Sequence, residues 1–341
     1  MGLLSGFYLF GLTCQKLLVK PRKLISKVIS VGNITLGGTG KTPAVIAIAE
    51  EAAKRGHLPC ILTRGYKGKS KGPCLITSGQ GSEVRVHGKK DLCCLPPDPL
   101  ICGDEPALMA FRLRNVPIIK CADRYKGGLF AISHIKSQTS NLLFILDDGF
   151  QHRALYRDID ILLIDATNPF GNERLFPEGR LREPLSSIKR AHVIALTKTD
   201  LMSEEIVSAI TQRIKKYNDT APVFTASHKA VALISPSGGP AGLDTLNGRK
   251  IYVFSGIANG EYFRNTLAAK GADIVRFKSF RDHYVYRQRD IDKIKMEAAG
   301  LDIITTEKDL VKIRELSLPE NVFALRIEFE IDRGFYDYIL R

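Results

Sequence analysis

Short apolar runs alternate with segments of helical periodicity along the first 225 residues. The runs have the four to six residues that are usual for buried strands, and they cover 28–31, 59–62, 116–119, 141–146, 159–164 and 192–196. Apolar residues recur at helical spacing over 44–55, 103–114 and 203–216. Strands that alternate with helices in this way predict an α/β fold with a doubly wound parallel sheet.

A second, shorter α/β series follows the Pro- and Gly-rich stretch at 236–240. Its predicted strands and helices are 251–255, 261–270, 273–277, 288–299 and 303–305. The pattern therefore predicts a second, smaller α/β domain. The expected division is an N-terminal amphipathic helix at 1–27, a larger domain at 28–225, a linker at 226–248 that could form a β-ribbon, and the smaller domain at 249–341.

Two stretches of the larger domain are too rich in Gly, Pro and charge to be the interior of an element. Residues 68–99 are expected to form a long excursion that holds substrate, with a hairpin near 84–86. The segment 170–184 carries several arginines, which suit a phosphorylated ligand. A solvated surface loop is the alternative for this second stretch.

The most specific motif runs from Ser30 to Pro43 and reads S-V-G-N-I-T-L-G-G-T-G-K-T-P. A strand, a glycine-rich turn and a helix suit polyphosphate binding, because backbone N–H groups can converge on phosphate oxygens. Lys41 can span the outer phosphates and Thr42 can ligate Mg²⁺. The expected binding residues are Thr35, Leu36, Gly37, Gly38, Thr39, Gly40, Lys41 and Thr42. Thr35 replaces the first glycine of G-x-x-x-x-G-K-[ST], so this is a variant P-loop; a plain glycine-rich turn is the alternative.

Three acidic residues stand at the ends of predicted elements, where they could bind a metal ion or accept a proton. Asp147 and Asp148 come directly after the strand at 141–146, where a P-loop enzyme needs an acidic group to hold Mg²⁺ opposite Thr42. An Asp-Gly turn is the alternative. Asp104 opens a helix, and it is either an N-cap or a base that accepts a proton from an attacking hydroxyl.

Two further motifs leave the function open. His283 follows the second strand of the smaller domain, and a lone histidine there is either structural or catalytic. The run from Thr197 to Asp200, T-K-T-D, is similar to the [NT]-K-x-D element that reads guanine in P-loop GTPases. A GTPase of the metallochaperone or targeting type is therefore the second hypothesis, and a membrane-bound nucleotide sensor is a third, non-enzymatic one.

The net charge of +14, from 50 Lys and Arg against 36 Asp and Glu, points to an acidic partner: nucleic acid, anionic lipid or a phosphorylated substrate. All seven cysteines fall in the first 121 residues without zinc-like spacing, which predicts reduced thiols and no metal site among them. No tract of about 18 apolar residues is present, so a full membrane span is not expected.

The first 49 residues contain no Asp or Glu. Leu3, Phe7, Phe10, Cys14 and Leu17 recur at helical spacing, and a basic flank of lysines and an arginine follows. This pattern favours an interfacial helix on an anionic leaflet. A first helix that packs on the core of its own domain is the alternative.

Seven motifs together resemble the tetraacyldisaccharide 4'-kinases of lipid A synthesis. They occur in order over nearly the whole chain as V-G-N-I-T-L-G-G-T-G-K-T-P (31–43), T-R-G-Y (63–66), G-D-E-P (103–106), D-D-G-F-Q-H (147–152), L-R-E-P (181–184), D-H-Y (282–284) and T-T-E-K-D (305–309). In that family the P-loop also has threonine at the position of Thr35. The N-terminal segment is shorter here than is usual in the family.

The resemblance implies transfer of the γ-phosphoryl group of ATP to the 4'-hydroxyl of a lipid-linked glucosamine disaccharide 1-phosphate, on the cytoplasmic face of the inner membrane. The 28–225 domain would then be a P-loop kinase domain that uses ATP and Mg²⁺. Nucleic acid is no longer an expected partner, and no obligate protein partner is inferred. The residues that the resemblance assigns are Asp104 as catalytic base, His283 as its partner, Lys41 and Arg182 at the phosphates, and Asp147, Asp148 and Glu183 near the metal.

Overall fold

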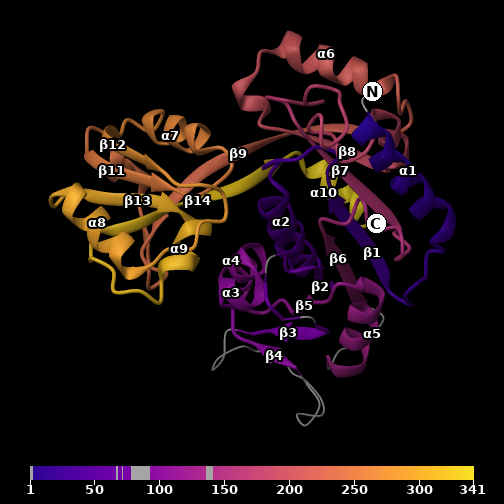
Figure 1. Ribbon diagram of the computed structural model, residues 1–341, viewed down its shortest axis with the longest axis horizontal. Helices are drawn as coiled ribbons and strands as arrows, with labels where there is room; N and C mark the ends of the chain where they lie inside the picture. The colour runs from indigo at the N-terminus through magenta and orange to yellow at the C-terminus, as the bar shows by residue number, and fades with distance from the viewer. Residues whose placement is uncertain (1–2, 67, 71, 78–92, 136–140) are drawn as a thin grey trace.

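The computed structural model describes residues 3–66, 68–70, 72–77, 93–135 and 141–341. The hairpin expected near 84–86 lies outside these residues. The described residues form one 14-stranded sheet that continues through both halves of the molecule (Figure 1). Its order is β12-β11-β13-β14-β9-β8-β7-β1-β6-β2-β5-β3-β4, with β10 paired to β9.

The larger lobe (residues 3–222 with the C-terminal helix) carries the six strands that the apolar runs predict. It also has two short strands that they do not predict, at Cys74–Ile76 and Cys94–Leu95, within the expected 68–99 excursion. In chain order these strands are β1 (Lys27–Gly32), β2 (Leu58–Thr63), β3 (Cys74–Ile76), β4 (Cys94–Leu95), β5 (Ile118–Lys120), β6 (Leu142–Asp147), β7 (Ile159–Asp165) and β8 (Val193–Thr197). The six from β1, β2 and β5 to β8 pair in parallel. The α/β class with a mainly parallel sheet is therefore confirmed.

Helices cover both faces of this part of the sheet. They are α1 (Leu3–Leu18), α2 (Lys41–Lys54), α3 (Pro99–Cys102), α4 (Asp104–Arg112), α5 (Arg124–His134) and α6 (Glu204–Lys215), with 3₁₀ turns η2 (Leu185–Arg190) and η3 (Thr199–Leu201). α5 was not predicted. Its sequence, RYKGGLFAISH, has two glycines that weaken a helical pattern, and both are buried against the core.

A two-stranded antiparallel ribbon, β9 (Val223–Ile234) and β14 (Val322–Ile331), joins the lobes (Figure 1). The smaller lobe (residues 235–321) contains β10 (Pro240–Ala241), η4 (Leu243–Leu246), β11 (Lys250–Ser255), α7 (Gly260–Ala268), β12 (Asp273–Ser279), α8 (Gln288–Ala298), β13 (Asp302–Thr306) and α9 (Glu307–Ile313). The linker expected at 226–248 begins inside β9, so the two lobes share a continuous sheet.

The C-terminal helix α10 (Arg333–Ile339) returns to the larger lobe, where Figure 1 shows both chain ends. Phe335 and Ile339 are fully buried in the cluster that also contains Ile29 of β1 and Ile48 of α2. Arg55 after α2 also pairs with Asp337 at 2.7 Å. The last residues of the expected 249–341 domain therefore pack on the P-loop half, because their apolar side chains complete its core.

Two cysteines depart from the sequence expectation. A disulfide joins Cys74 of β3 to Cys93, with their Cα atoms 4.7 Å apart. The prediction that all seven thiols are reduced is wrong for this pair, because residues 19 positions apart are brought side by side where β3 and β4 pair. Cys14, Cys60, Cys94, Cys102 and Cys121 are free.

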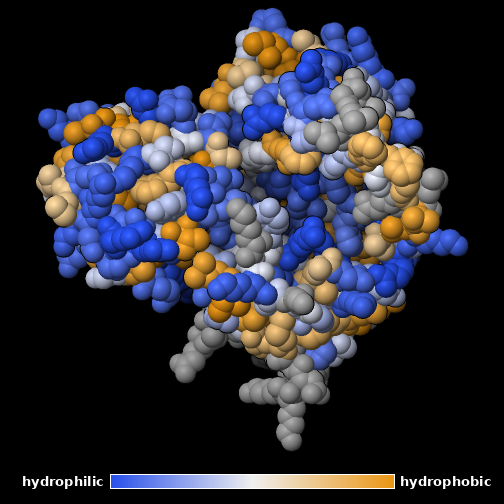
Figure 2. Space-filling view, in the orientation of Figure 1, coloured by the Kyte–Doolittle hydropathy of each residue, from blue (hydrophilic) through white to orange (hydrophobic). Residues whose placement is uncertain are grey.

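Helix α1 packs on the rest of the larger lobe and also exposes apolar side chains. Tyr8 donates a hydrogen bond to the carbonyl of Arg182 (3.0 Å), so one face packs on the larger lobe. Phe7 and Phe10, with 65% and 68% of their surface exposed, project from another face. Figure 2 shows hydrophobic colours in this part of the surface. Among the described residues, no helix is both long and apolar enough to cross a membrane.

Candidate active site

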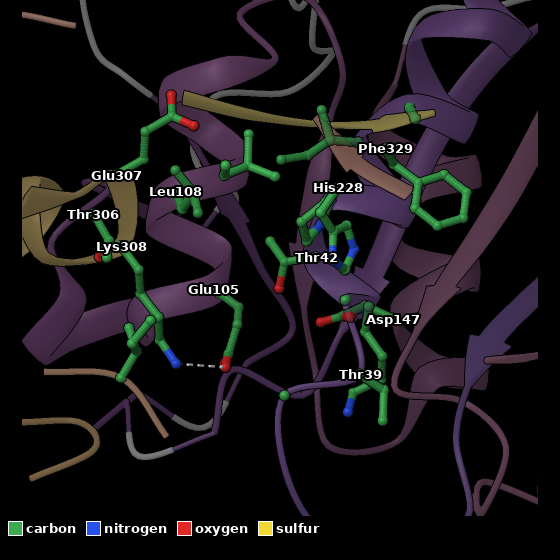
Figure 3. Close-up of a pocket in the computed structure, with 18 of the residues that line it drawn as sticks. Thr39, Thr42, Glu105, Leu108, Asp147, His228, Thr306, Glu307, Lys308 and Phe329 are labelled. Atoms are coloured by element: carbon green, nitrogen blue, oxygen red, sulfur yellow. Dashed lines mark hydrogen bonds and ion pairs between the residues drawn. The ribbon is translucent and has the colours of Figure 1, made fainter. Parts of the chain in front are cut away.

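The P-loop and the acidic end of β6 face each other because β1 and β6 are parallel neighbours, with Val31 opposite Asp147. Together they line a cavity of about 840 Å³ that extends between the two lobes. Figure 3 shows Thr42 and Asp147 on the larger-lobe side of this cavity and Lys308 of α9 on the other. The cavity thus brings together most of the sequence-predicted phosphate and metal residues, but not Thr35 or Glu183.

Two cations of the phosphate site meet on one asparagine. Lys41 Nζ and Arg182 Nη1 both donate to Asn33 Oδ1, at 3.2 and 3.1 Å. Arg182 also donates twice to Asp148, at 2.8 and 3.0 Å, and Lys41 Nζ lies 3.7 Å from Asp148 Oδ1. Burial opposes ionisation, but Lys41 and Arg182 lower the pKa of Asp148 to about 2. An ionised Asp148 therefore fixes both cations beside the P-loop.

Asp147 has the opposite electrostatic environment. It is buried, and Thr63 Oγ1 donates to its Oδ2 at 3.0 Å. Burial and the negative charges of Glu105 and Asp148 raise the pKa of Asp147 to about 7. A nearby cation would favour its ionised form, which is the environment expected of a divalent-cation ligand.

The predicted base and its partner come from different lobes. Asp104 begins α4, whereas His283 follows β12 of the smaller lobe; Nδ1 of His283 lies 2.9 Å from Oδ2 of Asp104. Lys312 Nζ lies 3.6 Å from the same oxygen. Burial raises the pKa of Asp104, but the hydrogen bond from His283 and the charge of Lys312 outweigh it and lower that pKa. Because an ionised carboxylate only accepts, Nδ1 is the donor.

Further ion pairs hold α4 against α9. Arg112 pairs with Glu307 at 3.0 Å, with both side chains largely buried, and Glu105 pairs with Lys308 at 3.2 Å (Figure 3). The contact between Asp104 and His283 is therefore part of a charged interface between the lobes.

Glu183 lies outside the lining of the main cavity. Arg190 donates to its two carboxylate oxygens at 2.7 and 2.9 Å, and Arg153 donates at 3.0 Å. Burial opposes ionisation of Glu183, but Arg190 and Arg153 outweigh it and lower the pKa. Both oxygens are engaged by cations of the protein, so the geometry gives no support to the predicted metal role.

The T-K-T-D run lies behind the P-loop. Lys198 Nζ donates to the Gly38 carbonyl at 3.1 Å and forms an ion pair with Asp165. Thr197 Oγ1 donates to the Thr39 carbonyl at 3.2 Å. The motif thus supports the loop.

Thr35 lines an adjoining cavity of about 310 Å³, and four neighbours line both cavities: Leu36, Gly37, Gly38 and Thr39.

A family model described as tetraacyldisaccharide-1-P 4'-kinase matches residues 4–341 of the chain. The chain belongs to this family. The tetraacyldisaccharide 4'-kinase of Syntrophus aciditrophicus is 35% identical, over 98% of this chain and 90% of that protein. That of Aquifex aeolicus is 36% identical, over 92% and 87%. A crystal structure of LpxK from Aquifex aeolicus in complex with ATP has a TM-score of 0.73 at 32% identity, covering 99% of this chain and 97% of that one.

Several residues that contact the site were not predicted from the sequence. Asn33 belongs to the P-loop motif, but the local sequence does not show that its side chain accepts hydrogen bonds from both Lys41 and Arg182. Lys308 and Lys312 are four residues apart on α9 and face the larger lobe through Glu105 and Asp104. Lys308 belongs to T-T-E-K-D and Lys312 lies one helical turn further on. This i, i+4 spacing could have indicated that both lysines lie on one face of a helix.

The residues present fit a magnesium ion held jointly by protein and phosphates. Thr42 and Asp147 both line the cavity, and the crowded carboxylates favour a cation there. No group of three or more His, Cys, Asp or Glu in the described part of the chain is arranged to hold a metal. Mg²⁺ is usually held by one or two protein ligands together with waters and substrate phosphates, and Thr42 and Asp147 could provide these protein ligands.

We expect Asp147→Asn to raise the melting temperature at pH 8 in EDTA. The pKa of Asp147 is about 7 in the folded chain and about 3.9 in an unfolded one. Between these values the unfolded state has lost a proton that the folded state keeps, so stability falls as the pH rises. The difference between variant and wild type should therefore shrink towards pH 4, and Mg²⁺ should reduce it at pH 8.

The matched control is Asp148→Asn, which should lower the melting temperature at pH 8, because it removes the ion pairs with Lys41 and Arg182. Thermal melts at both pH values give the comparison. If Asp147→Asn melted at a lower temperature than the wild type at both pH 8 and pH 4, the raised pKa assigned to Asp147 would be contradicted.

Proposed function

We propose that this chain is an ATP-dependent kinase that phosphorylates the 4'-hydroxyl of a tetraacyl glucosamine disaccharide 1-phosphate, a step of lipid A biosynthesis. The observation that carries the proposal is the contact between Asp104 and His283, because His283 lines the P-loop cavity. A nucleotide-hydrolysing switch needs to place only water there, whereas a kinase must also place and deprotonate an alcohol. Membership of the kinase family supports the same reading over the GTPase alternative.

The proposed mechanism relies on positioning and charge. The P-loop backbone, Lys41 and Arg182 hold the phosphates of ATP. Thr42 and Asp147 would hold Mg²⁺, which would neutralise the charge that develops during phosphoryl transfer. Asp148 keeps Lys41 and Arg182 in place through the contacts described above.

Asp104 is proposed to accept the proton of the 4'-hydroxyl. Its lowered pKa keeps it ionised at neutral pH and makes it a weak base, which suffices because phosphoryl transfer has a loose transition state with little need for a strong nucleophile. His283 donates its Nδ1 proton to Oδ2 of Asp104 and so orients the carboxylate. The proposed metal ligands are Thr42 and Asp147, with Asp148 close by.

We also propose that the protein works at the cytoplasmic face of the inner membrane, held by α1. Phe7, Phe10, Leu18 and Ile25 are exposed large apolar side chains at this end of the molecule. Part of the basic flank is engaged within the protein, since Arg22 pairs with Asp123 and Lys27 bonds to the carbonyl of Arg341.

The direct test of the function incubates the protein with ATP, Mg²⁺ and the tetraacyl disaccharide 1-phosphate, with mass spectrometry of the lipid. We expect the bisphosphate to form with ATP and to form poorly with GTP. Hydrolysis of GTP without phosphorylation of the lipid would favour the GTPase alternative. Nucleotide binding with neither reaction would favour the sensor.

The membrane proposal predicts that Phe7→Ser with Phe10→Ser weakens binding to anionic phospholipid vesicles at least about tenfold, because burying each phenylalanine contributes roughly 1.5–3 kcal/mol. Vesicle co-sedimentation measures the change. The matched control is Met296→Ser with Val275→Ser, which removes two exposed apolar side chains of the smaller lobe. Equal sedimentation of the wild type and the Phe7/Phe10 variant would refute attachment by α1.

A further inference from the structure

His228 lies beside the P-loop, on the ribbon strand β9. Its ring stands against Gly40, the residue that caps α2, and a Cβ added at Gly40 would collide with Nε2 and Cε1 of that ring. Gly40 also has a φ of 83°, in the left-handed region. Two independent constraints therefore require glycine here, and one of them comes from His228.

The position of His228 is fixed by its surroundings. It pairs with Phe329 of β14 in the ribbon, and the two ring centroids are 6.1 Å apart. The side chain lines the main cavity together with Gly40, Lys41 and Thr42, and only 7% of the residue is exposed. Figure 3 shows the ring among the labelled P-loop threonines.

One nitrogen of this histidine is unused by the protein. Nε2 is buried and has no hydrogen-bond partner among the residues that the structure describes. Leaving such a polar atom unsatisfied is unfavourable, because the atom has lost its hydrogen bonds to water without replacing them. Burial, and then the charge of Lys198, lower the pKa of His228 to about 4, so the ring is neutral at pH 7 and has one nitrogen able to donate.

The first turn of α2 lacks a donor. A helix N-terminus binds anions through its free N–H groups, and α2 begins with Lys41, Thr42 and Pro43. Pro43 has no N–H, so the third position of the turn cannot donate to a phosphate. The first turn of α2 therefore offers the polyphosphate one backbone N–H fewer than a turn without proline. His228, whose Nε2 has no partner in the described residues, lies next to this turn.

We propose that His228 is a nucleotide-binding residue whose Nε2–H donates to the phosphate chain of the bound nucleotide, in place of the missing N–H of Pro43, while its ring fixes Gly40. The inference rests on the proposed ATP-dependent function. Because Nε2 lies against Gly40, the N-cap of α2, a phosphate held by that helix terminus would come near it.

The test is ADP affinity by calorimetry, in the presence of Mg²⁺ and without any lipid acceptor. His228→Phe keeps a ring against Gly40 but removes the nitrogen, and it should weaken ADP binding by about 10- to 150-fold, the value of a hydrogen bond to a charged group. His228→Gln can place an amide N–H near the Nε2 position and should restore affinity to within about threefold of the wild type. Lys229→Ala, an exposed neighbour on β9, is the control and should leave the affinity unchanged.

The kinetic counterpart is a higher KM for ATP in His228→Phe with an unchanged KM for the lipid. ADP binding by His228→Phe at wild-type affinity would overturn the inference. Equal loss of affinity in the Phe and Gln variants, with lowered melting temperatures, would also overturn it, because the histidine would then only support the loop. If the wild type phosphorylated no disaccharide lipid but the Phe and Gln variants separated as expected, the proposed acceptor would be wrong and this inference would stand.

Discussion

The hydrogen bond between Asp104 and His283 joins two residues that are 179 positions apart in the sequence and lie in different lobes. It depends on the ribbon of β9 and β14, which continues the sheet from one lobe into the other. The neighbouring ion pairs between α4 and α9 hold the same interface. A site built across an interface is complete only when both lobes are in place, which suits an enzyme that must exclude water from phosphoryl transfer.

Asp147 and Asp148, which line the cavity, and Asp104, which contacts the lining residue His283, have three different electrostatic environments. Asp104 is kept ionised by a histidine and lysines, and Asp148 by Lys41 and Arg182, whereas Asp147 is surrounded by like charges and burial. Environment therefore separates groups of the same chemistry into a proposed base, a group that positions cations, and a proposed metal ligand.

The sequence predicted those features of the fold and the site that are decided by residues close together in the chain. Apolar runs and glycine spacing were enough for β1, the P-loop and the acidic end of β6, because each is decided within a few residues. The roles of His283 and Asp104 came from family resemblance, since no local pattern shows that they meet. The return of α10, the Cys74–Cys93 pair and the neutralisation of Glu183 by Arg153 and Arg190 all arise from contacts between distant segments. His228 was missed for the same reason, because its partner Gly40 is on another strand's loop.

The central claim is that Asp104 and His283 act as one unit, and a double-mutant cycle tests it most directly. Single-turnover rates are measured for Asp104→Ala, His283→Ala and the double variant, with ADP affinity as a control for folding. Asp104→Ala should be slower by at least about a hundredfold, with ADP binding intact, and the double variant should be slower than Asp104→Ala by no more than about threefold. Multiplicative losses, or a near-normal rate for Asp104→Ala, would contradict the account.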